Sequence, residues 1–208
     1  MSITPTSTRP PAAVAPWAEV VPGYGPVTVD LLLTLPDDGY RYEVVEGALV
    51  RMAGSGDEAT SIAFNFGLAL GNYVVPRRLG RLTGADGVYK FPGAETGLLP
   101  DVGFYAAAKR ALVVDRSKPI PFAPDLAVEV ASPSQDADDM AAKARTYLRG
   151  GTSLVWVLWP QGAHIDVWRA EQLAAPVTTL HSGDQLDGEN VLRGFSYPVA
   201  DVFADPLA

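Results

Sequence analysis

Two carboxylates in strand-like segments are the residues of this sequence whose types and spacing could do chemistry. Asp101 follows a proline at the start of an expected strand over 102–106, and Glu129 lies in the middle of an expected strand over 126–131. A glutamate between valines in mid-strand is costly unless it is solvated, paired or bound to a cation. That environment is typical of the floor of a site that a metal ion or a substrate must approach.

The alternation of side chains along a strand predicts which face each carboxylate occupies. Glu129 shares its face with Ala127 and Ala131, and the small alanines would leave space above the carboxylate. Asp101 shares its face with Gly103 and Tyr105. The opposite faces hold the core-facing rows, which are Val102, Phe104 and Ala106 in one strand and Leu126, Val128 and Val130 in the other.

Carboxylates from two neighbouring strands can hold a hard divalent cation such as Mg²⁺ (or Mn²⁺), which prefers oxygen ligands and keeps several waters. Lys143 lies on the expected helix that follows the Glu129 strand, four residues before Tyr147 and therefore on the same side of that helix. A metal can activate water and orient a phosphate, and a lysine can offset developing charge. Glu43, in another apolar strand, is a candidate third acidic ligand or a partner for a basic residue.

These residues leave several interpretations open. Glu129 could form a buried ion pair with Lys143, and Asp101 could be an ordinary strand-start residue. At the level of function, the first hypothesis is an Mg²⁺-dependent endonuclease that acts on DNA phosphodiesters, with Asp101, Glu129 and Lys143 as catalytic residues and with Asp101, Glu129 and Glu43 at the metal. The second is a binding or scaffold protein without activity. A third is a hydrolase that uses two carboxylates without a metal, as glycosidases do.

The elements that must position these residues follow from periodicity and from Gly and Pro signals. We expect helices over 31–35, 57–75 and 136–149; Pro76 and Gly80 end the second, and Gly150-Gly151 closes the third. We expect strands over 40–52 with a turn at 46–47, then over 87–91, 102–106, 126–131, 154–159, 163–169 and 177–181, and near Leu192. This order predicts an α/β (α+β mixed) fold, in which a mixed central sheet is flanked by helices.

Length and composition limit the class of protein. The 208 residues, 48% hydrophobic and 19% charged, predict one globular domain over 27–208. Residues 1–26 are rich in proline, which predicts a flexible tail or an arm that packs elsewhere, for example on a partner subunit. The absence of cysteine excludes disulfides and thiolate metal sites, and no apolar run is long enough to span a membrane. We therefore expect a cytoplasmic protein.

The net charge of −8 counts against a protein that coats nucleic acid by charge alone. It does not exclude a nuclease, because a divalent metal cancels the local negative charge of a carboxylate site. A homodimer is expected, because double-strand cutting and exposed apolar strands both favour symmetry.

Several segments, in order, resemble the Uma-two family, a bacterial group of restriction-endonuclease-like proteins. They are Tyr-Glu-Val-Val-Glu-Gly at 42–47, Leu-Pro-Asp-Val at 99–102, Pro-Asp-Leu-Ala-Val-Glu-Val-Ala-Ser-Pro-Ser at 124–134, Lys143 with Tyr147, and Gly-Gly-Thr-Ser-Leu-Val-Trp-Val at 150–157. The resemblance spans about residues 27–204, and the segment at 124–134 is its most specific part.

The resemblance implies the PD-(D/E)XK nuclease fold, with Asp101 as the motif aspartate and Glu129 as the motif glutamate. The motif would place a lysine at position 131, which is alanine here. The resemblance implies that Lys143, on the following helix, takes its place, and that Glu43 is a further metal ligand. Two departures are the stretch at 57–60, which lacks a histidine common in the family, and Trp159, where an aspartate is common.

Overall fold

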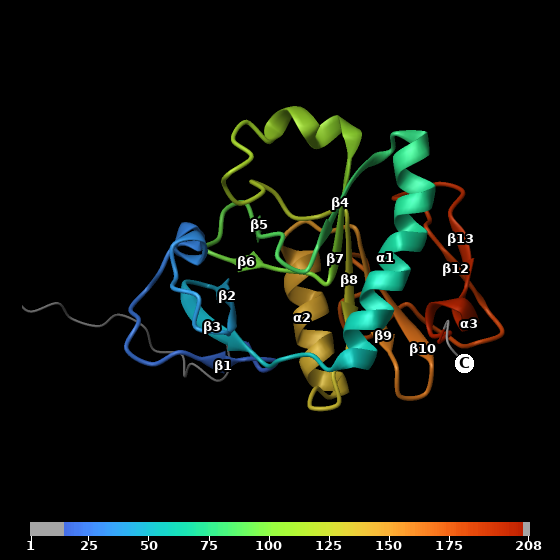
Figure 1. Cartoon of the computed structure of the whole chain (residues 1–208), viewed down its shortest axis with the longest axis horizontal. Coiled ribbons are helices and arrows are strands. Elements are labelled where there is room, and N and C mark those ends of the chain that lie inside the picture. The colour runs from blue at the N-terminus through green and yellow to red at the C-terminus, as the bar shows by residue number, and fades with distance from the viewer. Residues whose placement is uncertain (1–14, 206–208) are drawn as a thin grey trace, which may run out of the picture.

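The computed structural model describes residues 15–205 (Figure 1). Its strands are β1 (Glu19–Val20), β2 (Arg41–Val45), β3 (Ala48–Met52), β4 (Gly80–Gly84), β5 (Tyr89–Lys90), β6 (Gly97–Leu98), β7 (Val102–Ala106), β8 (Leu126–Val130), β9 (Leu154–Trp159), β10 (His164–Arg169), β11 (Thr178–Leu180), β12 (Gln185–Asp187) and β13 (Ser196–Pro198). Its helices are α1 (Asp57–Arg77), α2 (Ala137–Arg149) and α3 (Val199–Val202), with 3₁₀ helices η2 (Val29–Leu33) and η3 (Ala107–Leu112).

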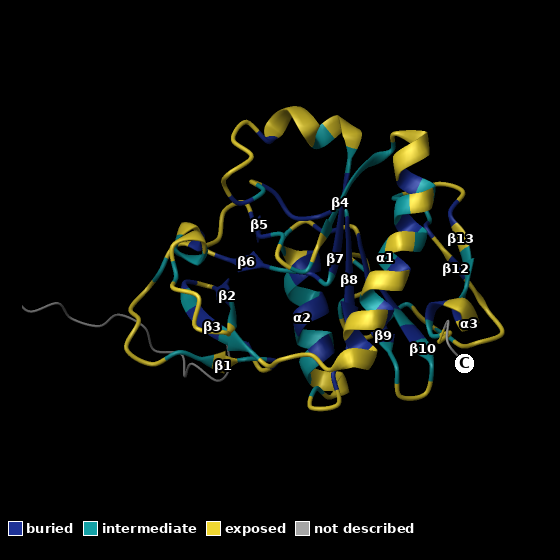
Figure 2. Ribbon diagram, viewed as in Figure 1, coloured by how far each residue is buried: buried dark blue, intermediate teal, exposed yellow. Residues whose placement is uncertain are grey.

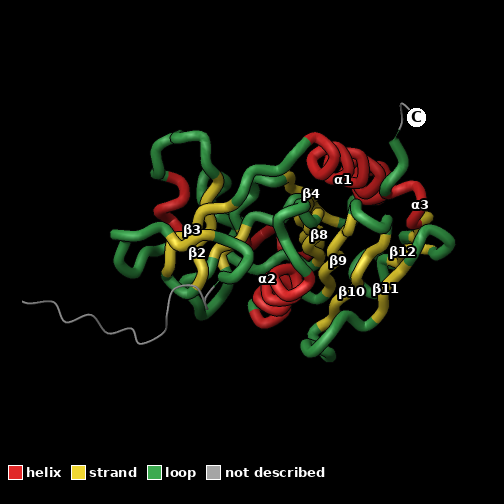
Figure 3. Tube along the Cα trace, turned by 90° about the horizontal axis from the view of Figure 1, so that it is seen from below, coloured by secondary structure: helices red, strands yellow, loops and turns green. Residues whose placement is uncertain are grey.

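A six-stranded sheet lies at the centre of the fold, in the order β11-β10-β9-β8-β7-β4. Strands β8 and β9 are parallel and the other neighbours are antiparallel, so the sheet is mixed. Helices α1 and α2 cover opposite faces of this sheet, as the view in Figure 3 shows. The predicted mixed sheet flanked by helices is therefore confirmed, and β8, which contains Glu129, lies inside it.

Both faces of the central sheet are buried, and the predicted alternation divides them correctly. On the α1 face, Val102, Phe104 and Val128 pack with Phe66 of the helix in one apolar cluster. On the α2 face, Ala127, Ala131 and Tyr105 pack with residues of α2 that include Met140, Ala144 and Tyr147. All five residues of β8 are buried (Figure 2). A strand covered on both sides cannot solvate a charged side chain, so its charge must find partners inside the protein.

A second, antiparallel sheet has the order β1-β3-β2-β6-β5 and lies beside the α2 face (Figure 1). Its β2–β3 hairpin turns at Glu46 and Gly47, with φ of 49° and 78°. Positive φ at both central residues is what a tight type I′ hairpin requires, and glycine adopts it without strain. The turn predicted at 46–47 is confirmed, and the hairpin places Glu43 of β2 in the interior.

Of the two alternatives for the N-terminal segment, the flexible tail is wrong where the structure describes it, and an arm that packs on the chain's own fold is present. Residues 15–26 are not a free tail, because Ala15 and Trp17 are buried and β1 pairs with β3 of the same chain. The bulk of Trp17 and the short Glu19–Val20 strand outweigh the proline-rich composition that suggested a tail. Residues 1–14, the rest of that predicted segment, lie outside the described residues.

Three smaller expectations also differ. The helix predicted over 31–35 is the short 3₁₀ helix η2. Helix α1 continues through Pro76 and ends when Arg78 adopts the left-handed conformation, with φ of 55°. Leu192 lies in a turn rather than a strand, since its N–H donates to the Gly188 carbonyl at 2.7 Å. The side chain of Leu192 is fully buried, and a buried residue in a turn gives the same apolar signal as one in a strand.

The fold contains strands that periodicity did not predict. Strand β4, at the edge of the central sheet, has glycine at both ends, which weakens the signal of a strand. Strand β6 has two residues and is too short to establish an alternating pattern. Strand β5 lies within the strand predicted over 87–91. Among the helices of the described part, none combines the length and the hydrophobicity that crossing a lipid bilayer requires.

Candidate active site

Asp101 lies immediately before β7, beside the end of β8. The register of these antiparallel strands pairs Val102 with Val128, which brings Asp101 next to the second half of β8. Its Oδ2 accepts a hydrogen bond from the Val130 N–H at 2.8 Å. No residue in 15–205 donates a hydrogen bond to its Oδ1. The strand pairing therefore fixes the carboxyl group and leaves one of its oxygens available for a ligand.

Glu129 is held on the α2 face of β8 by two side chains of helix α2. The Lys143 Nζ donates to Oε2 at 3.0 Å, and the Tyr147 hydroxyl donates to Oε1 at 2.6 Å. Because Lys143 and Tyr147 are one turn apart on the helix, the two donors reach the two oxygens of one carboxylate. The sequence left open an ion pair between Glu129 and Lys143, and the structure contains it.

The helix that presents Lys143 has well-defined ends. Asp136 caps it, because its side chain accepts from the Asp139 N–H at 2.9 Å and its own N–H donates to the Asp139 side chain. This reciprocal arrangement is a capping box, which satisfies two N–H groups at the start of the helix. A capped start fixes which residues of α2 face the sheet, and these include Lys143 and Tyr147.

Glu43 of β2 approaches the same lysine from the second sheet. Its Oε1 lies 3.4 Å from the Lys143 Nζ and accepts from the Leu99 N–H at 2.9 Å. Its Oε2 accepts from the Trp17 indole N–H at 3.1 Å. The sequence offered two roles for Glu43, a metal ligand or a partner of a basic residue, and the structure contains the second of these contacts.

The cluster of Glu43, Glu129 and Lys143 is almost completely removed from solvent. The exposed fractions of the three residues are 1%, 4% and 3%. Asp101, which is half-buried, adds a third carboxylate to the electrostatics of the site. One ammonium therefore faces three carboxylates in a region of low dielectric, where charges interact strongly.

The pKa values of the site reflect this excess of acidic groups. The pKa of Glu129 is raised to about 7, mainly by burial; Lys143 opposes this rise, and Asp101 and Glu43 contribute to it. Burial alone would lower the pKa of Lys143, but the carboxylates outweigh it and hold that pKa above its usual range. Burial and the neighbouring Glu129 raise the pKa of Tyr147, so its hydroxyl keeps the proton that it donates.

A small cleft opens onto these groups. It has a volume of about 30 Å³, which is room for a water molecule or an ion rather than for an organic ligand. Its walls are formed by Arg41, Tyr42, Glu43, Met52, Ala53, Ser55, Leu99, Asp101, Glu129, Ser132, Gln135 and Lys143. A larger groove of about 480 Å³ adjoins it along α1 and shares Arg41, Ser55 and Asp101 with it. Asp101 is thus the carboxylate that borders both the small cleft and the larger groove.

The donor set suits a hard divalent cation at a site of two protein ligands. Asp101 and Glu129 both line the cleft and offer only oxygen, the ligand type that Mg²⁺ and Mn²⁺ prefer. Within residues 15–205, no group of three or more acidic or histidine side chains is arranged to hold a metal ion. Asp101 and Glu129 are the two carboxylates that would hold a cation here, which would complete its shell with water or substrate, as is usual for Mg²⁺.

The structure brings together all four residues that the sequence singled out. Glu129, Lys143 and Glu43 form direct contacts, and Asp101 lines the same cleft. Sequence reasoning missed Trp17, which was assigned to the tail, and the donation from Tyr147 to Glu129. The spacing of Tyr147 from Lys143 was a signal for the second contact. No signal in the sequence pointed to the first, because it joins residues 26 positions apart.

The fold is nuclease-like, of the restriction-endonuclease kind. The family model Uma2, described as "Putative restriction endonuclease", matches residues 29–200. The chain therefore belongs to the Uma2 family. No curated protein matches the chain.

A solved structure supports the fold. The chain is similar to a crystal structure described as "a putative nuclease belonging to DUF820" from Anabaena variabilis, with a TM-score of 0.70. The two sequences are 19% identical, and the match covers 86% of this chain and 98% of the other. At that identity the likeness establishes the fold, and the chemistry of the site must be argued from this chain's own residues.

Proposed function

We propose that this protein is a metal-dependent endonuclease that hydrolyses DNA phosphodiester bonds. The observation that supports this most strongly is the meeting of Asp101 and Glu129 in one cleft, with the Lys143 ammonium 3.0 Å from Glu129. The chain belongs to a family whose description is that of a restriction endonuclease, so DNA is the substrate to test first.

Each residue has a distinct role in this proposal. Asp101 and Glu129 would hold Mg²⁺ or Mn²⁺, and the bound cation would supply Lewis acidity and lower the pKa of water. Tyr147 keeps the Glu129 carboxylate oriented through its 2.6 Å hydrogen bond. The Lys143 ammonium has three N–H donors; it donates one hydrogen bond to Glu129 and forms an ion pair with Glu43, which leaves a further donor. The third is available to orient the attacking water or to offset negative charge on the phosphate.

The acidic character of the protein is compatible with this proposal. The chain has a net charge of −8, so the polyanionic backbone of DNA would not be attracted by charge alone. Three carboxylates surround the site, and a divalent cation there would cancel part of their charge where the phosphate must approach. Binding of DNA is therefore expected to depend on the metal.

A homodimer is part of the proposal. Phe64, Leu68 and Val75 lie on the outer side of α1 and are exposed by 73%, 56% and 67%. Their spacing places them on one face of the helix, and a second copy could cover it symmetrically. Sedimentation velocity of the protein and of Leu68→Glu measures this. A dimer that the charge dissociates supports the proposal, and a monomer at all concentrations contradicts it.

A second candidate function is a nuclease-like binding or scaffold protein that has lost its activity. The observation in its favour is that Lys143 and Tyr147 already occupy both oxygens of Glu129. Each carboxylate oxygen has a second lone pair that can still accept a ligand, so this occupancy does not close the site. The two candidates differ in one measurable property, which is cleavage of DNA in the presence of a divalent metal.

Conversion of supercoiled plasmid to nicked and linear forms, with Mg²⁺ or Mn²⁺, tests the proposal. We expect cleavage by the wild type, none by Glu129→Ala, and unchanged cleavage by Asp138→Asn, which alters an exposed carboxylate of the same helix. Circular dichroism establishes that each variant is folded. Cleavage that survives in Glu129→Ala would refute the assignment, and cleavage insensitive to a chelator would favour the metal-free hydrolase.

A further inference from the structure

The surroundings of Glu43 differ from those of the other two carboxylates. Both of its oxygens accept hydrogen bonds from uncharged donors, the Trp17 indole N–H at 3.1 Å and the Leu99 N–H at 2.9 Å. The residue is 1% exposed. Asp101, in contrast, has one oxygen with no donor among residues 15–205. Glu43 is therefore fixed at both oxygens by uncharged donors, whereas one of the two donors to Glu129 is the Lys143 ammonium itself.

The position of Lys143 depends on two carboxylates that come from different sheets. Glu129 lies 3.0 Å from its Nζ, and Glu43 lies 3.4 Å away. With Glu129 alone, the ammonium would settle on that carboxylate and compete with other ligands for its oxygens. A second carboxylate on β2 shares the ammonium and limits how far the lysine can move toward Glu129. The lysine is 3% exposed, so bulk solvent screens its interaction with the two carboxylates very little.

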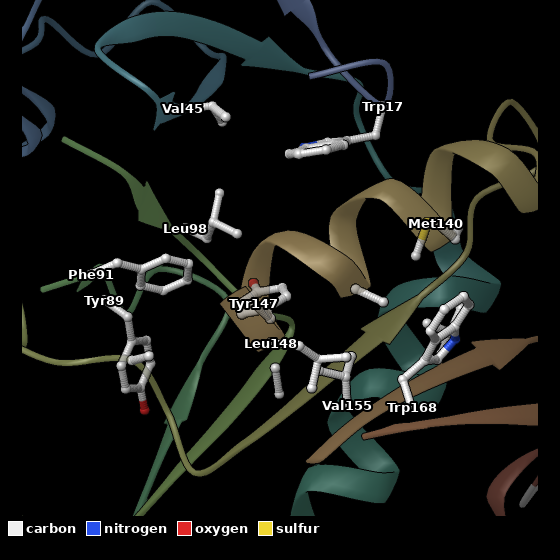
Figure 4. Packing of buried hydrophobic residues seen from close by; sticks show 14 of the residues in the cluster. Trp17, Val45, Tyr89, Phe91, Leu98, Met140, Tyr147, Leu148, Val155 and Trp168 are labelled. Carbon is white, nitrogen blue, oxygen red and sulfur yellow. The ribbon is translucent and has the colours of Figure 1, made fainter. Parts of the chain in front are cut away.

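Trp17 connects this arrangement to the N-terminal segment. Figure 4 shows its indole ring between the strands of the second sheet and helix α2, above the cluster that contains Leu98 and Tyr147. Strand β1, which begins two residues later, pairs with β3. Because β3 is the hairpin partner of β2, the segment around Trp17 is anchored to the same hairpin that presents Glu43.

We propose that Glu43 is a positioning residue that, fixed by Trp17 and Leu99, holds the Lys143 ammonium at the cleft, and that Glu43 does not ligate the metal ion. This inference rests on the proposed function for its catalytic consequence, but the contact between Glu43 and Lys143 can be measured without it. It differs from the role that the family resemblance implied for Glu43, which was a further metal ligand. Outer groups that orient a ligand or a catalytic side chain typically affect activity about 10- to 100-fold.

Glu43→Gln is the variant that separates the two roles, because it removes the charge and preserves the shape. The carbonyl oxygen of glutamine can still accept from Trp17 or from Leu99. We expect Mn²⁺ binding, measured by calorimetry, to persist in Glu43→Gln, while Asp101→Asn loses it. We expect kcat for plasmid cleavage to fall about 10- to 100-fold with KM unchanged. Asp138→Asn serves as the matched control.

Detection of the Lys143 ammonium by ¹⁵N NMR provides a readout that needs no enzymatic activity. A buried ammonium held between two carboxylates exchanges its protons slowly and gives an observable Nζ–H signal. We expect this signal in the wild type and expect it to be lost or strongly shifted in Glu43→Gln. Trp17→Phe, which keeps an aromatic ring and removes the indole donor, should shift it less.

The outcomes are distinct. Loss of Mn²⁺ binding in Glu43→Gln as complete as in Asp101→Asn would make Glu43 a metal ligand and overturn the inference. An unchanged Lys143 signal in a folded Glu43→Gln variant would also overturn it. Absence of cleavage and of Mn²⁺ binding in the wild type, together with a Lys143 signal that depends on Glu43, would refute the proposed function and leave the positioning contact intact.

Discussion

Both faces of strand β8 are buried, but one buries only apolar side chains of the strand and the other also buries a charged one. On the α1 face, Leu126 and Val128 pack among apolar side chains only. On the α2 face, Glu129 is buried with a lysine and a second glutamate. A buried charged cluster stabilises a protein less than well-packed apolar residues of similar volume would. The α1 face of β8 is therefore explained by packing alone, whereas the proposed function would give a reason for the buried charges on the α2 face.

Removal of the single cation should have the largest effect on stability. Lys143→Met leaves Glu43 and Glu129 buried without their shared partner, so we expect the free energy of unfolding to fall by about 3–5 kcal/mol. Urea denaturation measures this. Adding Glu129→Gln to the same chain removes one of the stranded charges and should restore part of the loss. A double variant as unstable as the sum of the two single variants would contradict the coupling.

A cavity on the apolar α1 face should lower the free energy of unfolding about as much as Lys143→Met does. It should leave metal binding unchanged. Leu126→Ala removes a fully buried side chain on the α1 face, and we expect a loss of about 2–5 kcal/mol in the same urea experiment. Mn²⁺ affinity should be unchanged, provided that the variant is studied where it is folded. A change in metal affinity as large as that in Asp101→Asn would mean that the two faces are not independent.

Loss of the Tyr147 hydroxyl, which donates to Glu129, should lower the free energy of unfolding by less. Tyr147→Phe keeps the ring that packs in the core and removes a hydrogen bond to a buried carboxylate, so we expect a loss of about 1.5–3 kcal/mol. Thermal unfolding followed by circular dichroism measures it. The Glu129 carboxylate would lose one of its two hydrogen-bond donors, so the rate of DNA cleavage should fall as well. A variant with wild-type stability would show that water replaces the hydroxyl.

The smallest effect is expected at the start of the helix that carries Lys143. Asp136→Ala removes the capping carboxylate of α2, and we expect a loss of about 1 kcal/mol of unfolding free energy. The matched control is Asp138→Asn, an exposed residue of the same turn, which should change stability by less than about 0.5 kcal/mol. Equal effects of the two substitutions would indicate that helix charge, rather than the specific cap, is what matters.

Local patterns predicted much of the fold and the members of the site. Alternation along 126–130 was enough to place Glu129 and Val128 on opposite faces of the sheet. The four-residue spacing placed Lys143 and Tyr147 on one side of a helix. The contacts between sheets were not predictable in this way. Trp17 reaches Glu43 only because β1 pairs with β3, and pairing of distant strands depends on the whole fold. The proline-rich composition of the N-terminal segment suggested a tail, although Trp17 is buried and anchors residues around it.

A crystal structure of the protein with Mn²⁺ is the measurement that most directly tests whether two strands hold a divalent ion. The account predicts an anomalous difference peak bound by the free Oδ1 of Asp101 and by Glu129, with Glu43 still bonded to Trp17 and Lys143. A peak located elsewhere, or none at saturating Mn²⁺ with Lys143 unmoved, would contradict it.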